Sequence, residues 1–392
     1  MLARIDLRGD HGDPARRLPR PDQAGAQAVR ARVAEILADV RARGDAAVVE
    51  HATAIDGVGG PFDVSDQEVD RAVAGLDGDV AAALESAVGQ VRWFHQQGRP
   101  AAWSAPRGGA TMGTRFVPLR RVGCCVPGGQ APLVSTAIMT IVPARLAGVD
   151  EVVVVTPPAG DGSVSPAILA ATRLAGGADR ILRLGGAQAV PAGITEVAII
   201  ADDTAQPRHV ACDLVAQAEH DPQATALLIT PDAGLAEHVD AALADEVAAA
   251  RHSERIRTAL DALGAAVLVD DLDHAVTVAD AFAAEHLEVQ TRQPQKVADQ
   301  VRCAGAIFVG SHTPVSLGDY AAGPNHTLPT AGAARFVGGL RTADFLRPVN
   351  WVSYEPGELA AFAHVTDALG ALEDLPAHSR AVRARTDEAG PE

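Results

Sequence analysis

The run Val152-Val153-Val154-Val155 decides the fold class of this chain. A strand inside a parallel sheet is buried on both faces and reads as a continuous apolar run, so four successive valines predict such a strand. Apolar runs at 122–126 and 181–184 predict a strand on either side, and the two intervals predict helices at about 135–146 and 166–174. Strands and helices in this alternation form one half of a doubly wound sheet.

A second alternating series follows residue 193. Its strands are predicted at 197–201, 226–230, 266–269 and 306–309, and its helices around 206–220, 233–249 and 272–284. Helical spacing of apolar residues also predicts helices around Val33–Val40 and Val80–Phe94. We therefore expect an α/β fold with two doubly wound, Rossmann-like domains, preceded by an N-terminal arm and followed by a C-terminal helical tail.

The composition argues against several classes of protein. The 392 residues carry a formal charge of −17 and only 3% aromatics, which argues against a nucleic-acid partner. No apolar run approaches the ~18 residues of a membrane helix, and the first residues lack the apolar core of a signal peptide. The cysteines have no metal-binding spacing and predict reduced thiols in a cytoplasmic protein: Cys124, Cys125, Cys212 and Cys303.

A functional loop is predicted at residues 318–330, which read GDYAAGPNHTLPT. Two glycines and two prolines make this stretch too irregular for a helix or a central strand. Loops with many constrained positions commonly carry function, and this one contains the carboxylate of Asp319 and the imidazole of His326.

A metal site can be drawn from four residues of different segments. Gln217 and His220 stand at i and i+3 near the end of a predicted helix, so they share a face, whereas Glu219 points elsewhere. With Asp319 and His378 they would supply the mixed nitrogen and oxygen ligands that suit zinc. The alternative is that each is ordinary, since most of the 13 histidines should be surface or satisfied core residues and no HExxH spacing occurs.

Glu285 and His286 form a candidate acid–base pair after an apolar helix. Oxidation of an alcohol needs a base for the hydroxyl proton, and histidine suits that role at neutral pH, while a carboxylate can activate water. The alternative is a plain helix C-terminus in which His286 meets the helix dipole and Glu285 is solvated.

Two glycine turns follow predicted strands, VPGG at 126–129 and LGGAQ at 184–188. Glycine turns that open a helix suit phosphate or dinucleotide contacts. Neither turn has the GxGxxG spacing, and each is equally consistent with a tight turn that binds nothing.

Together these motifs resemble the histidinol dehydrogenases across almost the whole chain, and their shared order argues against chance similarity. The matching stretches are DVRARGDAA at 39–47, VPGG at 126–129, GGAQAV at 185–190, QAEHDP at 217–222, AAEHLEVQT at 283–291, GDYAAGPNHTLPT at 318–330 and EDLPAH at 373–378.

The resemblance implies a zinc-dependent enzyme that oxidises L-histidinol to L-histidine in two NAD-dependent steps through an enzyme-held aldehyde. Zinc in this family holds the substrate's imidazole and amine, and is mainly a positioning ion. The positions that match its ligands are Gln217, His220, Asp319 and His378.

The resemblance also assigns roles to the catalytic and substrate-contacting residues. His286 matches the base for hydride transfer, and Glu285 matches the residue that activates water for the second oxidation. The expected substrate contacts are Thr195, Gln217, His220, His286, Asp319, His326, Glu373 and His378. In this family the tail that carries Glu373 and His378 reaches into the partner subunit's site, so a homodimer is expected.

This chain departs from the family on the cofactor side. Family members continue well past the GGAQA stretch, through a Gly-Pro-Gly-Asn turn that contacts NAD, whereas here residue 190 is followed directly by Pro191-Ala192-Gly193-Ile194-Thr195-Glu196. A segment the size of a βαβ unit, ~30 residues or more, is missing. Cys125 replaces a tyrosine expected before VPGG, and Gln188 is the NAD-contact position that remains.

The expected domains follow from these matches. They are an N-terminal arm at 1–24, a main α/β substrate and metal domain at 25–122 and 194–340, a shortened NAD-facing α/β domain at 123–193, and a dimer-swapped C-terminal tail at 341–392.

Two alternatives to a histidinol dehydrogenase remain open. One is a paralogue that binds zinc and a small amine or imidazole ligand without turning over NAD. The other is a dehydrogenase of the same family that acts on another small alcohol. Glu373 and His378 favour a substrate with an amine and an imidazole over the last option.

Overall fold

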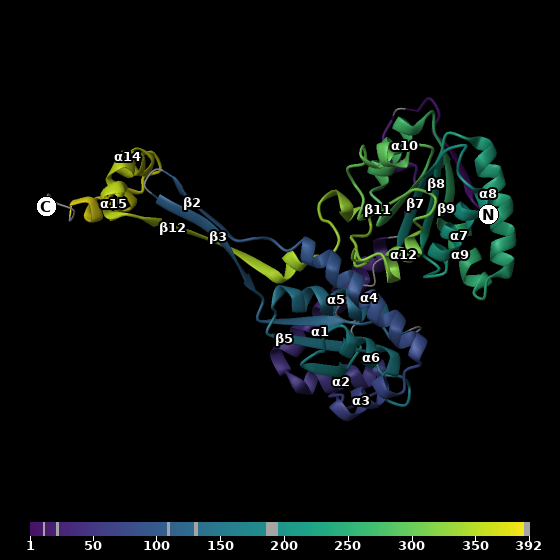
Figure 1. The fold of residues 1–392 in the computed structure, drawn as a ribbon, viewed down its shortest axis with the longest axis horizontal. Helices are drawn as coiled ribbons and strands as arrows, with labels where there is room; N and C mark the ends of the chain where they lie inside the picture. The colour runs from purple at the N-terminus through teal and green to yellow at the C-terminus, as the bar shows by residue number, and fades with distance from the viewer. Residues whose placement is uncertain (11, 21–22, 108–109, 129–131, 186–194, 388–392) are drawn as a thin grey trace.

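The computed structural model describes residues 1–10, 12–20, 23–107, 110–128, 132–185 and 195–387. Two α/β lobes lie side by side, and a long ribbon carries a small helical tail away from them (Figure 1). The mixed α/β class with parallel sheets is confirmed.

The larger lobe is built on a six-stranded parallel sheet with the order β1-β9-β8-β7-β10-β11. Its strands are β1 (Ala3–Asp6), β7 (Glu196–Ala201), β8 (Thr225–Thr230), β9 (Gly264–Leu268), β10 (His286–Gln290) and β11 (Ala306–Val309). Strands β7, β8 and β9 are buried along their whole length, as largely apolar runs predict for a parallel sheet, and β10 is equally buried although its residues alternate between polar and apolar.

Helices cover both faces of this sheet. They are α7 (Pro207–Ala218), α8 (Ala233–Ala249), α9 (Ser253–Leu263), α10 (Leu272–Phe282) and α11 (Pro294–Ala298). Side chains alternate along each strand, so Ile199 packs with α7, α8 and α9 on one face, while Ile200 packs with α10 and α11 on the other.

The smaller lobe contains a three-stranded parallel sheet in the order β4-β5-β6. Its elements are α1 (Gln23–Arg43), α2 (Asp45–Asp56), α3 (Asp66–Ala74), α4 (Gly78–Gln97), β4 (Arg121–Cys125), α5 (Val134–Ala147), β5 (Glu151–Thr156), α6 (Pro166–Leu174) and β6 (Arg180–Arg183), whereas η1 (Pro14–Arg16) packs on α10 of the larger lobe. The valine run is β5, and Val152 and Val154 are fully buried in its core.

The outer edge of β6 is covered by the segment before α3. Val64 N donates to Ile181 O at 2.9 Å, and Arg183 N donates to Phe62 O at 2.8 Å. Because an uncovered strand edge presents unpaired backbone groups, this short antiparallel pairing closes one side of a very narrow sheet.

Glu68 fastens this edge segment to helix α3. Its carboxylate accepts from Ser65 N at 2.9 Å, which completes a capping box at the start of the helix. The same carboxylate accepts from Arg183 Nη2 at 2.9 Å, so one residue links the helix start to β6.

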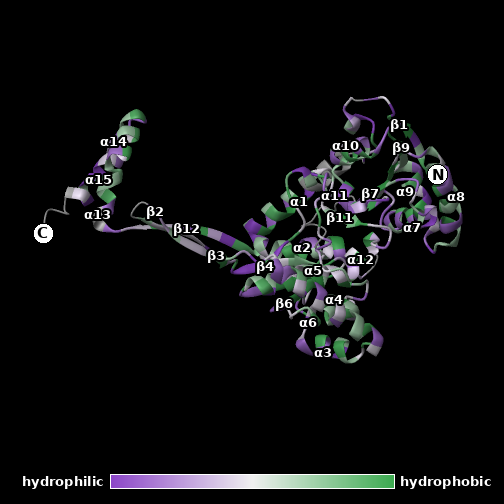
Figure 2. Cartoon of the chain, turned by 45° about the horizontal axis from the view of Figure 1, so that its top comes forward, coloured by the Kyte–Doolittle hydropathy of each residue, from purple (hydrophilic) through white to green (hydrophobic). Residues whose placement is uncertain are grey.

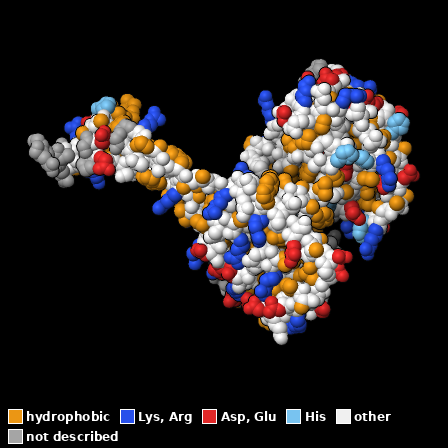
Figure 3. Space-filling view, in the orientation of Figure 1, with side chains coloured by type: hydrophobic (Ala, Val, Ile, Leu, Met, Phe, Trp, Pro, Cys, Tyr) orange, Lys and Arg blue, Asp and Glu red, His pale blue; other side chains and the backbone are white. Residues whose placement is uncertain are grey.

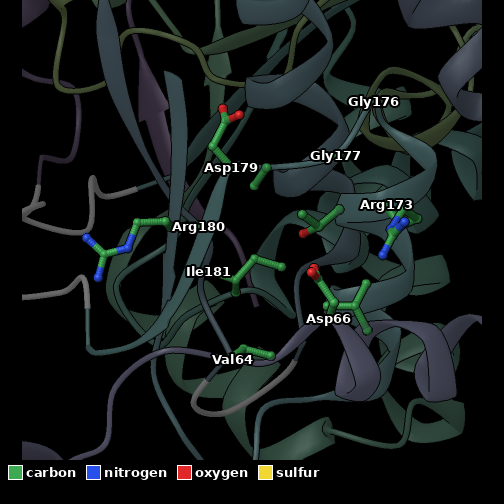
Figure 4. A pocket seen from close by; sticks show the side chains of 11 residues that line it. Val64, Asp66, Arg173, Gly176, Gly177, Asp179, Arg180 and Ile181 are labelled. Carbon is green, nitrogen blue, oxygen red and sulfur yellow. The ribbon is translucent and has the colours of Figure 1, made fainter. Parts of the chain in front are cut away.

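A cavity of about 420 Å³ lies between α3, the end of α6 and the amino end of β6 (Figure 4). Val64, Arg173 and Ile181 contribute to its wall. It opens at the amino ends of the small sheet's strands, opposite to the end from which α5 continues toward the larger lobe.

The ribbon is a three-stranded antiparallel sheet, which the sequence did not predict. It joins β2 (Trp103–Arg107), β3 (Ala110–Pro118) and β12 (Leu346–Tyr354), and β12 pairs along the whole of β3. The tail beyond it consists of α13 (Pro356–Leu359), η4 (Ala360–Phe362), α14 (Ala363–Leu372) and α15 (Pro376–Asp387).

Apolar side chains remain exposed on the ribbon and tail. Figure 2 shows the tail lying apart from both lobes, and Figure 3 shows hydrophobic side chains along the ribbon and on the tail. The exposed set includes Trp103, Trp351, Val352, Val365, Leu369, Leu372 and Leu375.

The structure corrects the expected grouping of residues 25–122 with 194–340. Helices α3 and α4 pack instead on the smaller sheet, because Val69, Leu84 and Val88 lie in one core with Val152. The predicted N-terminal arm also contributes β1 to the larger sheet, where it pairs with β9. Helix α9 was missed as well.

Within the described ranges, no helix has both the length and the apolar character needed to cross a membrane.

We expect Glu68→Ala to destabilise the smaller lobe by about 1–2 kcal/mol, since it removes a helix cap and a hydrogen bond to β6. Urea unfolding followed by tryptophan fluorescence measures this change. The matched control is Glu85→Ala on the exposed face of α4, which should change stability by less than about 0.5 kcal/mol. Equal stability of the two variants would contradict the proposed role of Glu68.

Candidate active site

The candidate site lies where β7 and β10 begin. His286 pairs in register with Val197 of β7 and with Ala306 of β11. Because these strands are parallel, their first residues lie at the same edge of the sheet. Thr195, Glu196, Glu285 and His286 therefore meet at the amino end of the larger sheet. The alternative of a plain helix C-terminus for Glu285 and His286 is wrong, since α10 ends at Phe282 and His286 opens a central strand.

A chain of hydrogen bonds connects helix α7 to Glu285. Gln217 Nε2 donates to Thr195 Oγ1 at 2.8 Å, and Thr195 Oγ1 donates to Glu285 Oε2 at 2.8 Å. Glu196 N donates to the same carboxyl oxygen at 3.1 Å. Since the Gln217 amide nitrogen is engaged with Thr195, its Oε1 is the end that can meet a ligand.

His286 presents one ring nitrogen to the site. Its Nδ1 lies 3.3 Å from the backbone oxygen of Glu196, and because a carbonyl only accepts, Nδ1 carries the hydrogen. Nε2 is buried and has no hydrogen-bond partner among the described residues. Burial lowers the pKa of His286 to about 4, against the opposing charge of Asp319, so the imidazole is neutral at neutral pH.

Glu285 is held as a neutral acid in the same environment. Burial raises its pKa to about 8, against the hydrogen bonds from Thr195 and Glu196. Its Oε2 lies 3.5 Å from His286 Nδ1, yet the two pKa shifts run in opposite directions. The pair is therefore not an ion pair at neutral pH, and both members are uncharged.

The 318–330 segment begins as a helix, α12 (Val315–Tyr320), so the expectation that all of it is a loop was wrong. Gly318 permits this helix, because an added Cβ would lie 2.5 Å from the ring of Phe308 on β11. Asp319 follows on the last turn of α12. Its charge acts on Glu285, His286 and His326.

The rest of the segment docks on the smaller lobe. Asn325 is buried, donates to Met139 O of α5 at 2.6 Å and lies 3.3 Å from His95 Nε2 of α4. Gly323 has φ +104°, and an added Cβ there would lie 3.0 Å from Gln90 O. These contacts hold His326 between the lobes, with its Nε2 buried and, within the described ranges, unpaired.

An apolar cavity of about 430 Å³ adjoins Asp319 and Tyr320. Val134 and Ser135 at the start of α5 line it, together with residues of α4 such as Leu84. The carboxyl end of the smaller sheet, from which α5 continues, thus faces the amino end of the larger sheet.

The structure brings most of the predicted site residues of one chain together. Hydrogen bonds or electrostatic interactions connect Thr195, Gln217, His220, Glu285, His286, Asp319 and His326. It does not bring Glu373 and His378 to them, because both are exposed on the distant tail (Figure 1).

Of the two predicted cofactor contacts, Cys125 lies half-buried at the end of β4, and Gln188 lies outside the described residues. Asn325 and Glu196 were missed as functional positions. The Thr195-Glu196 pair in the matched turn was the available signal for Glu196.

Among the side chains that the structure describes, no three from His, Cys, Asp and Glu gather closely enough to hold a metal ion. Of the four predicted ligands, one chain brings two histidine or carboxylate side chains to the site, those of His220 and Asp319. The amide of Gln217 lies with them, and His378 lies on the distant tail. An imidazole, a carboxylate and an amide oxygen suit zinc chemically, with one position left for a further ligand.

Comparison with known proteins yields one family. The family model described as histidinol dehydrogenase matches residues 19–192 and 190–386. The histidinol dehydrogenase of Thermobifida fusca is 44% identical over 429 residues, covering 98% of each chain. That of Mycobacterium tuberculosis is 43% identical over 437 residues, again covering 98% of each. A solved histidinol dehydrogenase from Elizabethkingia anophelis shares the fold, with a TM-score of 0.91 and 24% identity over 100% of this chain and 99% of that one.

The comparison also bears on the missing segment. The alignment with the T. fusca protein spans 429 positions and this chain has 392 residues, so at least 37 aligned positions have no counterpart here. The two matched segments of the family model meet at residues 190–192, the junction at which the segment is predicted to be missing.

Stability should depend on pH through Glu285. Its folded-state pKa, about 8, lies above the ordinary value of 4.5, so its contribution is present below pH 4.5 and is lost as the pH rises through 8. We expect the thermal midpoint of metal-free wild type to fall, relative to Glu285→Gln, between about pH 5 and pH 8. The control is Glu219→Gln at an exposed position, whose thermal midpoint should depend on pH in the same way as that of wild type. The same pH dependence of the midpoint in all three proteins would contradict the assignment.

Proposed function

The chain belongs to the histidinol dehydrogenase family, and from this premise we propose that it oxidises L-histidinol to L-histidine in two NAD-dependent steps. The observation that carries the proposal is the neutral imidazole of His286, whose Nε2 is buried and has no partner among the described residues, while its Nδ1 lies 3.5 Å from Glu285 Oε2. A histidine in this state can accept a proton at neutral pH, which the oxidation of an alcohol requires.

We propose that Gln217, His220 and Asp319 hold a zinc ion, and that His378 of a second copy completes the set. Their donor atoms fit zinc, and the Gln217–Thr195 hydrogen bond turns the amide oxygen toward the site. Zinc would hold and orient the imidazole and amine of the substrate. The buried Nε2 of His326, which has no partner in the described part of the chain, supports a polar ligand between the lobes, since a buried donor or acceptor normally has a partner.

In the first oxidation, His286 would take the hydroxyl proton on Nε2 while the adjacent carbon loses hydride to the nicotinamide. The carbonyl of Glu196 keeps the Nδ1 hydrogen in place, so the ring need not reorient. Burial keeps the imidazole neutral beforehand, and Asp319 stabilises the charge that it acquires.

In the second oxidation, Glu285 would take a proton from the water that adds to the aldehyde. Thr195 and the Glu196 amide fix the carboxyl group and favour its ionised form. A positive charge bound beside it would favour ionisation further, which offsets the burial that raises its pKa.

We propose that two chains form the enzyme and exchange tails. Leu372 of α14 is 84% exposed, and Val365 and Leu369 on the same helix are also exposed. Apolar side chains gathered on a projecting element mark an interaction surface. Exchange would also bring Glu373 and His378 to a site that one chain does not complete.

The division of labour between the two catalytic residues can be measured. His286→Asn should slow oxidation of histidinol by roughly 10²–10⁴-fold, the usual contribution of one general base. Glu285→Gln should slow oxidation of histidinal far more than the first hydride transfer. Single-turnover formation of NADH from each substrate separates the steps; equal defects in both steps for Glu285→Gln would refute the assignment.

Exchange of tails predicts that Leu372→Asp disrupts the dimer. A charge at this position would be buried against the partner, whereas on a free tail it would be harmless. Light scattering should give the mass of a dimer for wild type and for the control Val49→Asp, which places the same charge on the exposed surface of α2. Leu372→Asp should give a monomer or an aggregate. A monomeric wild type would rule the exchange out.

NAD binding is predicted to be weak. The missing positions include the turn expected to contact NAD, and losing several contacts of ~1 kcal/mol each raises the dissociation constant tens- to thousand-fold. Calorimetry with zinc, histidinol and NAD in turn should show near-normal binding of the first two and weak binding of the third. Tight NAD binding with full turnover would overturn this expectation, and no NAD binding would favour the paralogue that binds without turnover.

A further inference from the structure

Three elements that carry proposed site residues meet at one buried side chain, Glu288. It lies on β10 two residues after His286, is 1% exposed, and has no role in the chemistry described above. Residues two apart on a strand point to the same face. Leu287 and Val289 pack toward α10, so His286, Glu288 and Gln290 face the opposite side, where α7 and α12 lie.

The first connection runs to helix α12. Val315 N, at the first residue of this helix, donates to Glu288 Oε1 at 2.9 Å. Asp319 follows four residues later, about one helical turn away. The helix start is thus tied to β10 by a backbone hydrogen bond, while Gly318 packs against Phe308 further along.

The second connection runs to helix α7. Asp213 hydrogen-bonds the Glu288 carboxyl group, and Gln290 Nε2 donates to Asp213 Oδ2 at 3.0 Å and to Glu288 Oε2 at 2.8 Å. Gln217 stands four residues after Asp213 and so projects from the same face of α7. One turn of helix separates this contact from the proposed metal ligand.

We propose that Glu288 is a positioning residue that sets Gln217 and Asp319 at a fixed distance from His286. The inference rests on the proposed function of these three residues. The contact on α12 lies about one helical turn from Asp319, and the contact on α7 lies one turn from Gln217. Glu288 itself lies two strand residues from His286. A displacement at Glu288 is therefore transmitted to both proposed ligands.

The protonation of this cluster agrees with such a role. Burial, together with the charge of Asp213, raises the pKa of Glu288, and burial raises that of Asp213. A carboxyl pair of this kind retains a proton between its members. Glu288 can then accept from Val315 with one oxygen and donate to Asp213 with the other.

This arrangement identifies a conservative and a disruptive substitution. In Glu288→Gln, the amide oxygen can accept from Val315 and the amide nitrogen can donate to Asp213, so both connections can persist once Gln290 turns its Oε1, which has no partner among the described residues, toward the new amide nitrogen. Glu288→Leu has a similar volume and removes both. Val315→Pro removes the backbone donor and leaves Glu288 in place, at a first helical position where proline is tolerated, and it also replaces a side chain that packs against the core.

A buried carboxylate at the other end of the same strands provides the matched control. Asp202 follows β7, is 8% exposed and accepts from Arg292 N at 2.9 Å and Thr204 N at 3.0 Å. Asp202→Leu should therefore destabilise the fold in a similar way, but it should leave the hydrogen bonds that connect Glu288 to α7 and α12 in place. His220→Asn serves as the variant that lacks a proposed ligand.

The experiment is a titration of metal-stripped protein with zinc alone, in competition with a chromogenic chelator. We expect Glu288→Leu and Val315→Pro to weaken zinc binding about 10–100-fold, the range known for residues that orient metal ligands. Glu288→Gln should stay within about threefold of wild type, and Asp202→Leu should match wild type even if its thermal midpoint falls. Unchanged zinc affinity in Glu288→Leu, or an equal loss in Asp202→Leu, would overturn the proposal.

Hydrogen exchange of the metal-free protein separates this inference from the proposed function. The Ala321 and Ala322 amides donate to Leu317 O at the end of α12. In Glu288→Leu they should exchange at least about tenfold faster than in wild type, and in Asp202→Leu at the wild-type rate. Wild type that binds no zinc and does not oxidise histidinol would refute the proposed function, while unchanged exchange in Glu288→Leu would refute the positioning role.

Discussion

The withdrawal of Glu285 and His286 from water, at the edge where β7 and β10 begin, is the constraint on which the rest of the structure depends. Burial leaves both groups uncharged, so the fold can carry an acid and a base side by side without an ion pair. That burial needs a cover. Helix α7 contributes through Gln217, Phe308 of β11 packs against the His286 ring, and the contact of Asn325 with α5 holds the 318–330 segment against the smaller lobe.

Much of the α/β core could be predicted because its signals are local. The valine run of β5 and the 233–249 helix need only neighbouring residues to be recognised. The ribbon could not, because its strands β3 and β12 pair over more than 200 residues of sequence and β12 exposes most of its side chains. Strand β10 was missed for another reason: its alternating polar residues His286, Glu288 and Gln290 look solvated, yet all three are buried against partners.

The residues of the candidate site likewise divide into those that the sequence indicates and those that it does not. Helical spacing alone pairs Gln217 with His220, the irregular 318–330 stretch indicates Asp319 and His326, and the resemblance adds Thr195. Asn325 and Glu196 act through backbone groups, Met139 O for the one and a carbonyl facing His286 for the other, and sequence patterns do not record such contacts. The cover on β6, formed by residues 62–64, likewise depends on chain geometry that no periodicity describes.

The two sheets face the site with opposite ends of their strands. As a result, the two sides of the site carry partial charges of opposite sign. The larger sheet turns its amino edge to the site, and with it the carboxyl-terminal end of α7, whose backbone dipoles amount to roughly half a negative charge. The smaller sheet presents its carboxyl edge and the amino-terminal end of α5, which carries the opposite partial charge. A positive group would thus be favoured at the first of these helix ends and a negative group at the second. If two ligands of opposite charge bound here, the helix dipoles alone would favour one of them on each side of the site, before any side chain contributes.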